Sequence, residues 1–397
     1  MALLNRKEIY MLKFKKISAA FIAAIMTLSL AACGGDTGSS DNTQPNETTT
    51  ASSEEIQVSK RITVEGTKFM LDGKEWWING VNTPWIDWNE FGGTINEEKW
   101  DATFAQLAKD NINCTRIWIN CSGESIMRLK TTVEPQAVNV VHWTNVDKLF
   151  AMAAKHGVYI MATLLSFDHF KEPNGGYDQW RLLAQNKEYC DLYAEMYVKE
   201  FCKRYGENEY LFAIDIMNEP DWVHENAECG QLGFEYLSYL FGTVAATIHE
   251  NCDALVTVGM GMPKYNSDKY QGNFVSDAYL KEVTGKDTAY LDFYSPHYYG
   301  WMMGSFGLPF TQSPEAYGIE ATKPCVVGET PNDDENSVGI SVADKYVKAY
   351  ENGWNGVMVW MDPKQENAYG WYEYELTQSA SNKMYELIPD LIYPNGK

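Results

Sequence analysis

The stretch that decides the fold is residues 211–222, LFAIDIMNEPDW. Its first seven residues form an apolar run that is too short for a helix and rich in Ile, which predicts a buried strand. Pro220 has no backbone N–H and pushes the residue before it toward an extended conformation, so we expect the carboxylate of Glu219 at the strand end. An acid in this position is either a solvated loop residue or a catalytic group.

Short apolar runs alternate with longer amphipathic segments on both sides of this stretch. Strands are predicted at 76–81, 114–119, 158–165, 211–217, 255–259, 293–298, 325–328 and 357–361, and helices at 97–109, 146–155, 188–203, 234–249, 343–350 and 379–387. This alternation predicts parallel strands, and eight of them favour a closed α/β barrel, the (β/α)8 TIM barrel, over residues 58–397. Residues 62–71, with a turn at 72–73, predict a hairpin across the bottom of that domain.

The amino-terminal region differs in composition from the predicted barrel. Lysines precede an apolar run and the residues Leu30-Ala31-Ala32-Cys33, which resemble a bacterial lipobox, so residues 1–32 are predicted to be a lipoprotein signal peptide and Cys33 the lipidation site. An ordinary signal peptide with a chance cysteine is the alternative, and Met11 is a second candidate start. Residues 33–57 are acidic and rich in Ser and Thr, which predicts a disordered tether. The expected location is the cell surface or the extracellular space, with the protein anchored to a membrane through its lipid.

Composition restricts the partners. The formal net charge of −22 argues against nucleic acid and favours neutral or basic ligands. Aromatic residues make up 14% of the chain, and their flat faces suit sugar rings as well as core packing. The eight cysteines show no metal or redox spacing, and Cys114, Cys252 and Cys325 are expected to be buried thiols. No glycine-rich fingerprint, P-loop or zinc motif is present, so we expect a monomer without cofactor or metal.

Polar and aromatic residues follow the predicted strands, at the end where barrel enzymes place their active sites. Two of them are carboxylates, Glu219 after the fourth strand and Glu329 after the seventh. Glycoside hydrolysis needs such a pair, one protonated to donate to the leaving oxygen and one ionised to attack the anomeric carbon, about 5 Å apart if configuration is retained. We expect burial to raise the pKa of one carboxyl, while Arg116 and Tyr299 keep the other ionised.

These residues, taken in order, match a known family. Arg116, Asn218-Glu219-Pro220, His297-x-Tyr299, Gly328-Glu329 and Trp360 resemble the clan A retaining glycosidases and specifically glycoside hydrolase family 5, most closely its endo-β-1,4-mannanase and cellulase branch. The resemblance covers about residues 76–362, nearly all of the predicted barrel.

The resemblance implies a role for each matched residue. Glu219 would be the general acid/base and Glu329 the nucleophile, which Arg116 would orient and to which Tyr299 would donate. Asn218 would bind the sugar 2-hydroxyl, His297 would contact Glu219 or the substrate, and Trp360 would form a stacking floor.

Further candidates lie in the loops after the strands. Trp85, Trp222 and Trp301, with Trp88, Trp180 and Trp371, are candidate sugar-binding residues, about half of which we expect to be loop packing. His169, next to Asp168, is a further candidate because its loop is similar to one in β-mannanases. The acidic run 333–335 is interpreted as solvated rather than as a cation site.

The function predicted from the sequence is a retaining endo-glycoside hydrolase that cleaves a β-1,4-linked neutral plant polysaccharide by double displacement. Mannan or glucomannan is the expected substrate because the loop aromatics, Arg-Ile-Trp at 116–118 in strand two and His-Tyr-Tyr-Gly-Trp at 297–301 resemble those of endo-β-1,4-mannanases. A β-1,4-endoglucanase, or cellulase, is one alternative. A non-catalytic surface lipoprotein that binds glycans is the other, although such a protein would not need both carboxylates.

Overall fold

The stretch around Glu219 forms the strand β7 (Leu211–Asn218), which is buried along its whole length in the centre of a parallel sheet. The computed structural model describes residues 61–121, 123, 138–174, 176–334, 339–361 and 373–397. All of them belong to one compact unit, Gln57–Lys397. The predicted signal peptide, Cys33, the whole of the predicted tether, Glu335 and Trp371 lie outside the described residues.

Eight parallel strands form the barrel. In spatial order they are β11 (Ser295–Pro296), β8 (Leu255–Met260), β7, β6 (Tyr159–Ser166), β5 (Cys114–Trp118), β4 (Ile78–Asn82), β13 (Gly356–Trp360) and β12 (Val327–Thr330). The two edge strands meet through the parallel bridges Tyr294–Cys325 and His297–Glu329, and the Tyr298 N–H donates to the Glu329 carbonyl at 2.8 Å. The sheet is thereby closed into the predicted (β/α)8 barrel.

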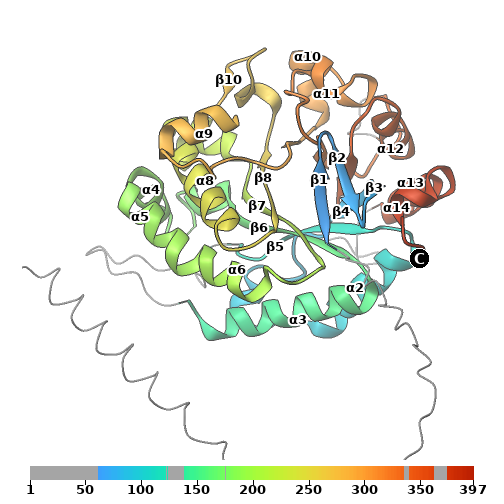
Figure 1. Ribbon diagram of the computed structural model, residues 1–397, viewed down its shortest axis with the longest axis horizontal. Coiled ribbons are helices and arrows are strands. Elements are labelled where there is room, and N and C mark those ends of the chain that lie inside the picture. Colours follow the sequence, from blue (N-terminus) through green and yellow to red (C-terminus); the bar gives the residue numbers. More distant parts are fainter. Residues whose placement is uncertain (1–60, 122, 124–137, 175, 335–338, 362–372) are drawn as a thin grey trace, which may run out of the picture. The chain divides into compact units, whose positions relative to one another are not determined.

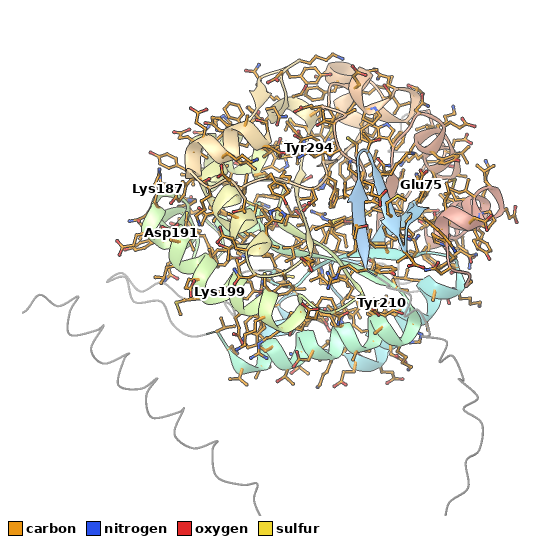
Figure 2. All side chains as sticks on the ribbon, viewed as in Figure 1. Glu75, Lys187, Asp191, Lys199, Tyr210 and Tyr294 are labelled. Atoms are coloured by element: carbon orange, nitrogen blue, oxygen red, sulfur yellow. The ribbon has the colours of Figure 1, made fainter. Side chains whose placement is uncertain are left out.

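Helices surround the strands and cover them on the outside (Figure 1). The main ones are α2 (Glu97–Lys109), α3 (Val140–His156), α4 (Tyr177–Gln185), α5 (Lys187–Tyr193), α6 (Lys199–Tyr205), α8 (Phe234–His249), α9 (Asp277–Thr284), α12 (Val342–Glu351) and α13 (Tyr374–Leu387). Shorter ones are α7 (Pro220–Glu225), α10 (Met303–Phe306), α11 (Pro314–Tyr317) and α14 (Pro389–Ile392). Side chains fill the layer between strands and helices (Figure 2).

The boundaries of three helices show where the apolar periodicity of the sequence was a sufficient signal and where it was not. The predicted helices 97–109 and 234–249 match α2 and α8. The helix predicted from residue 146 instead begins at Val140, because the Asn139 side chain accepts the Val141 N–H and caps it. The prediction missed residues 140–145, the first two of which, Val140 and Val141, are exposed and do not follow the apolar period.

An antiparallel sheet covers the amino-terminal ends of the barrel strands. It consists of β1 (Ile62–Glu65), β2 (Lys68–Leu71) and β3 (Lys74–Trp76) in that order, so the predicted hairpin is a three-stranded meander with a second turn. Trp76 pairs with Phe69 in this sheet rather than starting the first barrel strand, which is β4. Both side chains pack on the residues at the bottom of the barrel, as expected for a cover.

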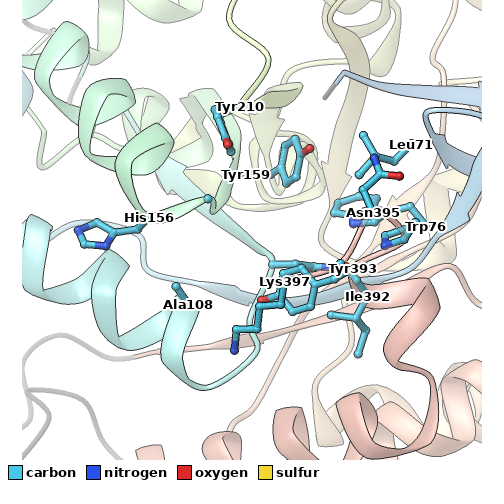
Figure 3. A pocket seen from close by; sticks show the side chains of 14 residues that line it. Leu71, Trp76, Ala108, His156, Tyr159, Tyr210, Ile392, Tyr393, Asn395 and Lys397 are labelled. Carbon is cyan, nitrogen blue, oxygen red and sulfur yellow. Dashed lines mark hydrogen bonds between the residues drawn. The ribbon is translucent and has the colours of Figure 1, made fainter. Parts of the chain in front are cut away.

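A cavity of about 380 Å³ opens at this bottom end (Figure 3). Leu71 and Trp76 of the antiparallel sheet, Tyr159 at the start of β6 and Tyr393 near the carboxyl terminus line it. None of the carboxylates discussed below reaches it.

The described cysteines are all free thiols. Cys114 and Cys325 are buried as predicted, but Cys252 is partly exposed because it follows the end of α8 in a loop. A search of the described residues for a helix with the length and apolar character of a membrane span finds none.

Candidate active site

A β-bulge in β7 sets which side chains enter the top of the barrel. Asp215 is in register with Thr257 of β8, whereas Asn218 is in register with Gly259, so three residues of β7 span two of β8. Regular alternation would direct residues three apart to opposite faces. The extra residue instead brings Asp215 and Asn218 to the same side, where both contact Arg116.

Arg116, from β5, is wholly buried and connects the strands around it. Its Nε and Nη2 donate to Asp215 Oδ2 at 2.9 and 2.7 Å, and Nη2 also donates to Asn218 Oδ1 at 2.9 Å. Nη1 donates to Asn82 Oδ1 at 3.0 Å and to Glu329 Oε2 at 3.1 Å. A buried guanidinium is stable only when its N–H donors have acceptors. These hydrogen bonds therefore hold Arg116 in place, and with it the carboxylate of Glu329.

Gly259 makes room for this network. A Cβ there would lie 2.5 Å from Arg116 Nη2 and 3.0 Å from His297 Nε2. Any larger residue would therefore displace the guanidinium, and the glycine backbone N–H donates to Asp215 Oδ1 at 2.8 Å.

Glu219 occupies a sharp turn between β7 and α7. Its φ and ψ are 49° and 55°, a left-handed conformation, so the predicted extended conformation before Pro220 is wrong. The chain must reverse at once into α7, whose first residue is Pro220, and the Glu219 N–H donates to the Gly259 carbonyl at 2.7 Å. A left-handed non-glycine residue costs about 1–3 kcal/mol, and such strain concentrates at functional sites.

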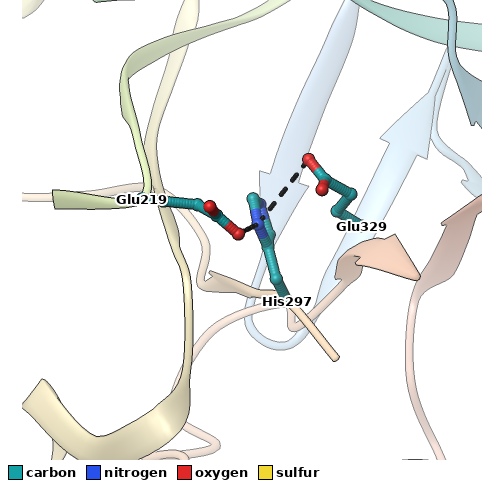
Figure 4. Close-up of side chains that lie close together, drawn as sticks. All are labelled: Glu219, His297 and Glu329. Carbon is teal, nitrogen blue, oxygen red and sulfur yellow. Dashed lines mark hydrogen bonds and ion pairs between the residues drawn. The ribbon is translucent and has the colours of Figure 1, made fainter. Parts of the chain in front are cut away.

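The two carboxyl groups meet across the barrel through His297. Its Nδ1 lies 3.0 Å from Glu219 Oε1 and 3.7 Å from Glu329 Oε2 (Figure 4). The facing atoms of all three residues lie within 4.8 Å of one another. Trp222 Nε1 donates to Glu219 Oε2 at 3.0 Å, and the Tyr299 hydroxyl donates to Glu329 Oε1 at 2.5 Å.

Burial determines the protonation of this group. It raises the pKa of Glu219 to about 7, with Arg116 and the Trp222 hydrogen bond opposing the rise. Burial also raises the pKa of Glu329, opposed by His297, Arg116 and Tyr299. The same loss of solvation lowers the pKa of His297 to about 4, so the imidazole is neutral at pH 7.

The two carboxyls therefore differ in the groups that contact them and in the protonation state that these groups favour. Glu329 has a cation and a hydroxyl donor on its oxygens, which favour its ionised form. Glu219 has the neutral partners His297 and Trp222, and its side chain is 13% exposed at the open end of the barrel. Such a pair can supply one proton donor and one nucleophile.

Among the described residues, these three are also the group that could hold a metal ion. Glu329 Oε2 already pairs with the Arg116 guanidinium, so a divalent cation would face a fixed positive charge. The donor set is better matched to proton transfer than to a metal.

Four tryptophans form one wall beside Arg116, the ion-pair partner of Glu329. Trp360, at the end of β13, packs edge to face against Trp118 at 5.3 Å and Trp85 at 5.8 Å between ring centroids. Trp88 packs on Trp85 and is 42% exposed. Trp118 also lies under the Arg116 guanidinium, 4.2 Å from its carbon. The predicted residues Trp85 and Trp360 are thus in one partly exposed aromatic cluster.

Trp222 and Trp301 form the other wall, beside Glu219. Their ring centroids are 5.9 Å apart, and Trp301 is 59% exposed. Both line an open cleft of about 370 Å³ together with Glu225, Lys264 and Tyr270. Trp222 therefore both lines this cleft and donates to Glu219.

His169 lies apart from these walls. It is wholly buried, its Nδ1 is 3.1 Å from the Ser166 backbone N–H, and its ring packs edge to face on Trp180. The contacts to Ser166 cap the single turn that follows β6, and Trp180, which lies in α4 rather than in a loop, is buried against the His169 ring. Asp168 in the same turn forms an ion pair with Lys171 and lies close enough to Glu219 to raise its pKa.

The sequence reasoning missed three residues that hold the predicted ones in place. Asp215 and Asn82 both accept from Arg116, and Trp118 stacks on it. A signal for Asp215 was present, since it is the one charged residue inside the apolar run of residues 211–217 and a buried charge needs a partner. Asn82 follows the first predicted strand directly, so its place at the strand end was visible but its bond to Arg116 was not.

Among the known proteins whose sequences are similar to this chain are two mannan endo-1,4-β-mannosidases. No protein-family model matches the chain. The mannan endo-1,4-β-mannosidase of Mytilus edulis is 25% identical over 333 residues, which are 76% of this chain and 87% of the relative. The mannan endo-1,4-β-mannosidase of Cryptopygus antarcticus is 22% identical over 82% of this chain and 89% of its own length.

Solved structures agree on the fold. The β-mannanase of the blue mussel Mytilus edulis superimposes with a TM-score of 0.71 at 20% identity, over 82% of this chain and 96% of that one. The β-1,4-mannanase of the sea hare Aplysia kurodai gives a TM-score of 0.72 at 21% identity, over 85% and 99%. At these identities the structural likeness shows the barrel alone.

Proposed function

We propose that this chain is a retaining endo-β-1,4-mannanase of the family 5 glycoside hydrolase type, with Glu219 as general acid/base and Glu329 as nucleophile. The observation that carries the proposal is the carboxyl pair. Its facing oxygens lie within 4.8 Å, close to the separation of about 5 Å typical of retaining enzymes and shorter than the roughly 6.5–9.5 Å of inverting ones.

In the first step Glu329 attacks the anomeric carbon while Glu219 protonates the departing glycosidic oxygen. Arg116 and Tyr299 hold the attacking carboxylate in place, one on each oxygen. The bond between the anomeric carbon and the leaving oxygen breaks, and a covalent glycosyl ester with Glu329 forms. In the second step Glu219, now ionised, takes a proton from water, which hydrolyses the ester with overall retention.

The remaining polar residues position the sugar. Asn218 Oδ1 is engaged by Arg116, while its Nδ2 makes only a long 3.4 Å bond to Ser166 Oγ, so this amide is the group that donates to the sugar 2-hydroxyl. Trp360 forms the floor under the sugar at the cleavage site. The walls that contain Trp85 and Trp301 bind sugar units on either side, which suits cleavage inside a chain.

Mannan is the substrate that the relatives favour, because they are themselves mannan endo-1,4-β-mannosidases. The cellulase and the non-catalytic alternatives are correspondingly less favoured. The purified chain should release reducing sugar from mannan and glucomannan at rates well above those on carboxymethyl cellulose. Faster cleavage of carboxymethyl cellulose would replace the mannanase proposal with the cellulase, and glycan binding without cleavage would overturn the enzymatic proposal.

We also propose that Cys33 is lipidated after removal of residues 1–32 and that a tether over 33–57 holds a monomeric enzyme at a membrane surface. The lipobox-like residues 30–33 support this location. Labelling with a fatty acid analogue in a bacterial host should mark the wild-type chain and not Cys33→Ala. Equal labelling of both chains would contradict the proposed site.

A further inference from the structure

Asp221 is a buried carboxyl that the proposed mechanism does not use. It lies two residues beyond Glu219, as the second residue of α7, and it is wholly inaccessible to solvent. Its Oδ2 accepts the Gly261 backbone N–H at 2.6 Å. Its Oδ1 is buried and has no hydrogen-bond partner among the described residues. A buried acid with a single partner needs an explanation beyond surface solvation.

The contact with Gly261 is one of two described backbone contacts that tie Glu219 and Asp221 to the end of β8 and the residue that follows it. The other is the Glu219 N–H, which donates to the Gly259 carbonyl at 2.7 Å. One contact is made by the backbone of Glu219 itself, and the other by the side chain of Asp221 in the first turn of α7. Together they hold the turn against residues 259–261.

Gly261 lies close to the side chains of both Asp221 and Glu219. A Cβ at this position would lie 3.2 Å from Asp221 Oδ2 and 3.3 Å from the Glu219 Cβ. The carboxyl of Asp221 therefore determines how closely Gly261 approaches the base of the Glu219 side chain. A shift of Gly261 or Asp221 would therefore move Glu219 relative to His297 and Trp222, its two hydrogen-bond partners.

The conformation of Glu219 explains why such a clamp is needed. A left-handed glutamate followed by a proline is not favoured locally, so it persists only where surrounding contacts over-determine it. The bonds at Gly259 and Gly261 are two such contacts.

We propose that Asp221 is a positioning residue for proton donation: its bond to the Gly261 N–H holds Glu219 where it can protonate the leaving oxygen. This inference rests on the proposed function. It concerns the proton donor alone, since no described hydrogen bond or ion pair links Asp221 to Glu329, Arg116 or Tyr299.

The test compares two substrates in the full-length chain. Asp221→Ala should lower kcat/KM on mannan by roughly 10²-fold, the loss expected for a misplaced catalytic group. On 2,4-dinitrophenyl β-mannobioside, whose leaving group needs no proton, the glycosylation rate should change only a few-fold, by about 2–3-fold. Asp221→Asn keeps an acceptor for the Gly261 N–H and should restore most of the loss.

A merely structural role would lower both rates equally. Rates are therefore divided by the fraction of chain that a 2-fluoro mannoside traps as the ester on Glu329, which counts only correctly folded molecules. Asp221→Ser, whose hydroxyl is one atom shorter, serves as a second variant if the alanine chain does not fold.

Equal losses on the two substrates, or no difference between Asn and Ala, would overturn the role of Asp221 while leaving the proposed function standing. A wild-type chain that cleaves neither substrate would overturn the proposed function, and this inference with it.

Discussion

The two ends of the barrel are built from the same strands and have opposite chemistry. At the amino-terminal end Phe69, Phe212 and Phe293 are almost fully buried and pack edge to face or tilted, with ring centroids 5.1–5.4 Å apart. At the carboxyl end Arg116 and Glu329 belong to a hydrogen-bonded network that is almost as deeply buried. Burial alone therefore does not distinguish core from site.

The distinction lies in what each end gains from burial. Apolar rings gain free energy when they leave water, so the covered end stabilises the fold. Carboxyls lose solvation there, which shifts their pKa values and prepares them for chemistry. Variants at the amino-terminal end should consequently change the stability of the fold, and variants at the carboxyl end should change the rate of the reaction.

The largest effect is expected from Glu329→Ala. Without the nucleophile, kcat on mannan should fall by on the order of 10⁴-fold or more, since no ester can form. Added azide should rescue cleavage of an activated aryl mannobioside and give the glycosyl azide of inverted configuration. A variant that keeps its activity would remove Glu329 from the nucleophile role.

Glu219→Ala should cost less and in a substrate-dependent way. We expect a loss of about 10²–10⁴-fold in kcat/KM on mannan and a much smaller loss of the glycosylation rate with a dinitrophenyl leaving group. Azide should here give the product of retained configuration, the opposite of the Glu329 variant. The stereochemistry of the two azide products, determined by NMR, separates the roles; identical products would contradict the assignment.

Phe69→Ala tests the other end. Removing this ring from its contacts with Phe212 and Phe293 should lower the free energy of unfolding by about 3–5 kcal/mol. Below the unfolding transition kcat should equal that of the wild type. Urea unfolding and initial rates on mannan measure the two quantities. A fall in kcat without a loss of stability would mean that the two ends are not independent.

The smallest effect is that of pH. The pKa of Glu219 is raised to about 7, and the acid must carry its proton, so kcat/KM on mannan should fall about tenfold per pH unit above 7. The acid limb should lie above the ordinary carboxyl pKa, because burial raises the pKa of Glu329, which must be ionised. With a dinitrophenyl leaving group the alkaline limb of glycosylation should disappear. A profile that does not fall above pH 7 on mannan would contradict the assignment of Glu219.

Strand periodicity was sufficient to predict much of this molecule. The barrel strands were found as local apolar runs and most of the main helices by their apolar faces, although α4 and α9 were not predicted, so the order of the βα units is largely encoded locally. Because parallel strands end at the same edge of a barrel, that order also predicts that Arg116, Glu219, His297, Tyr299 and Glu329 meet at one end.

Only the tertiary structure decided how these groups are held. The bulge that turns Asp215 and Asn218 to one side depends on the register between β7 and β8, which alternation along one strand does not contain. The left-handed turn at Glu219 contradicts the local preference before proline and is maintained by Gly259 and Gly261, about 40 residues away in the chain. The sequence thus determined which residues meet, because that follows from local patterns and strand order. Their exact spacing and protonation depend on burial and non-local hydrogen bonds, which exist only once the barrel has closed.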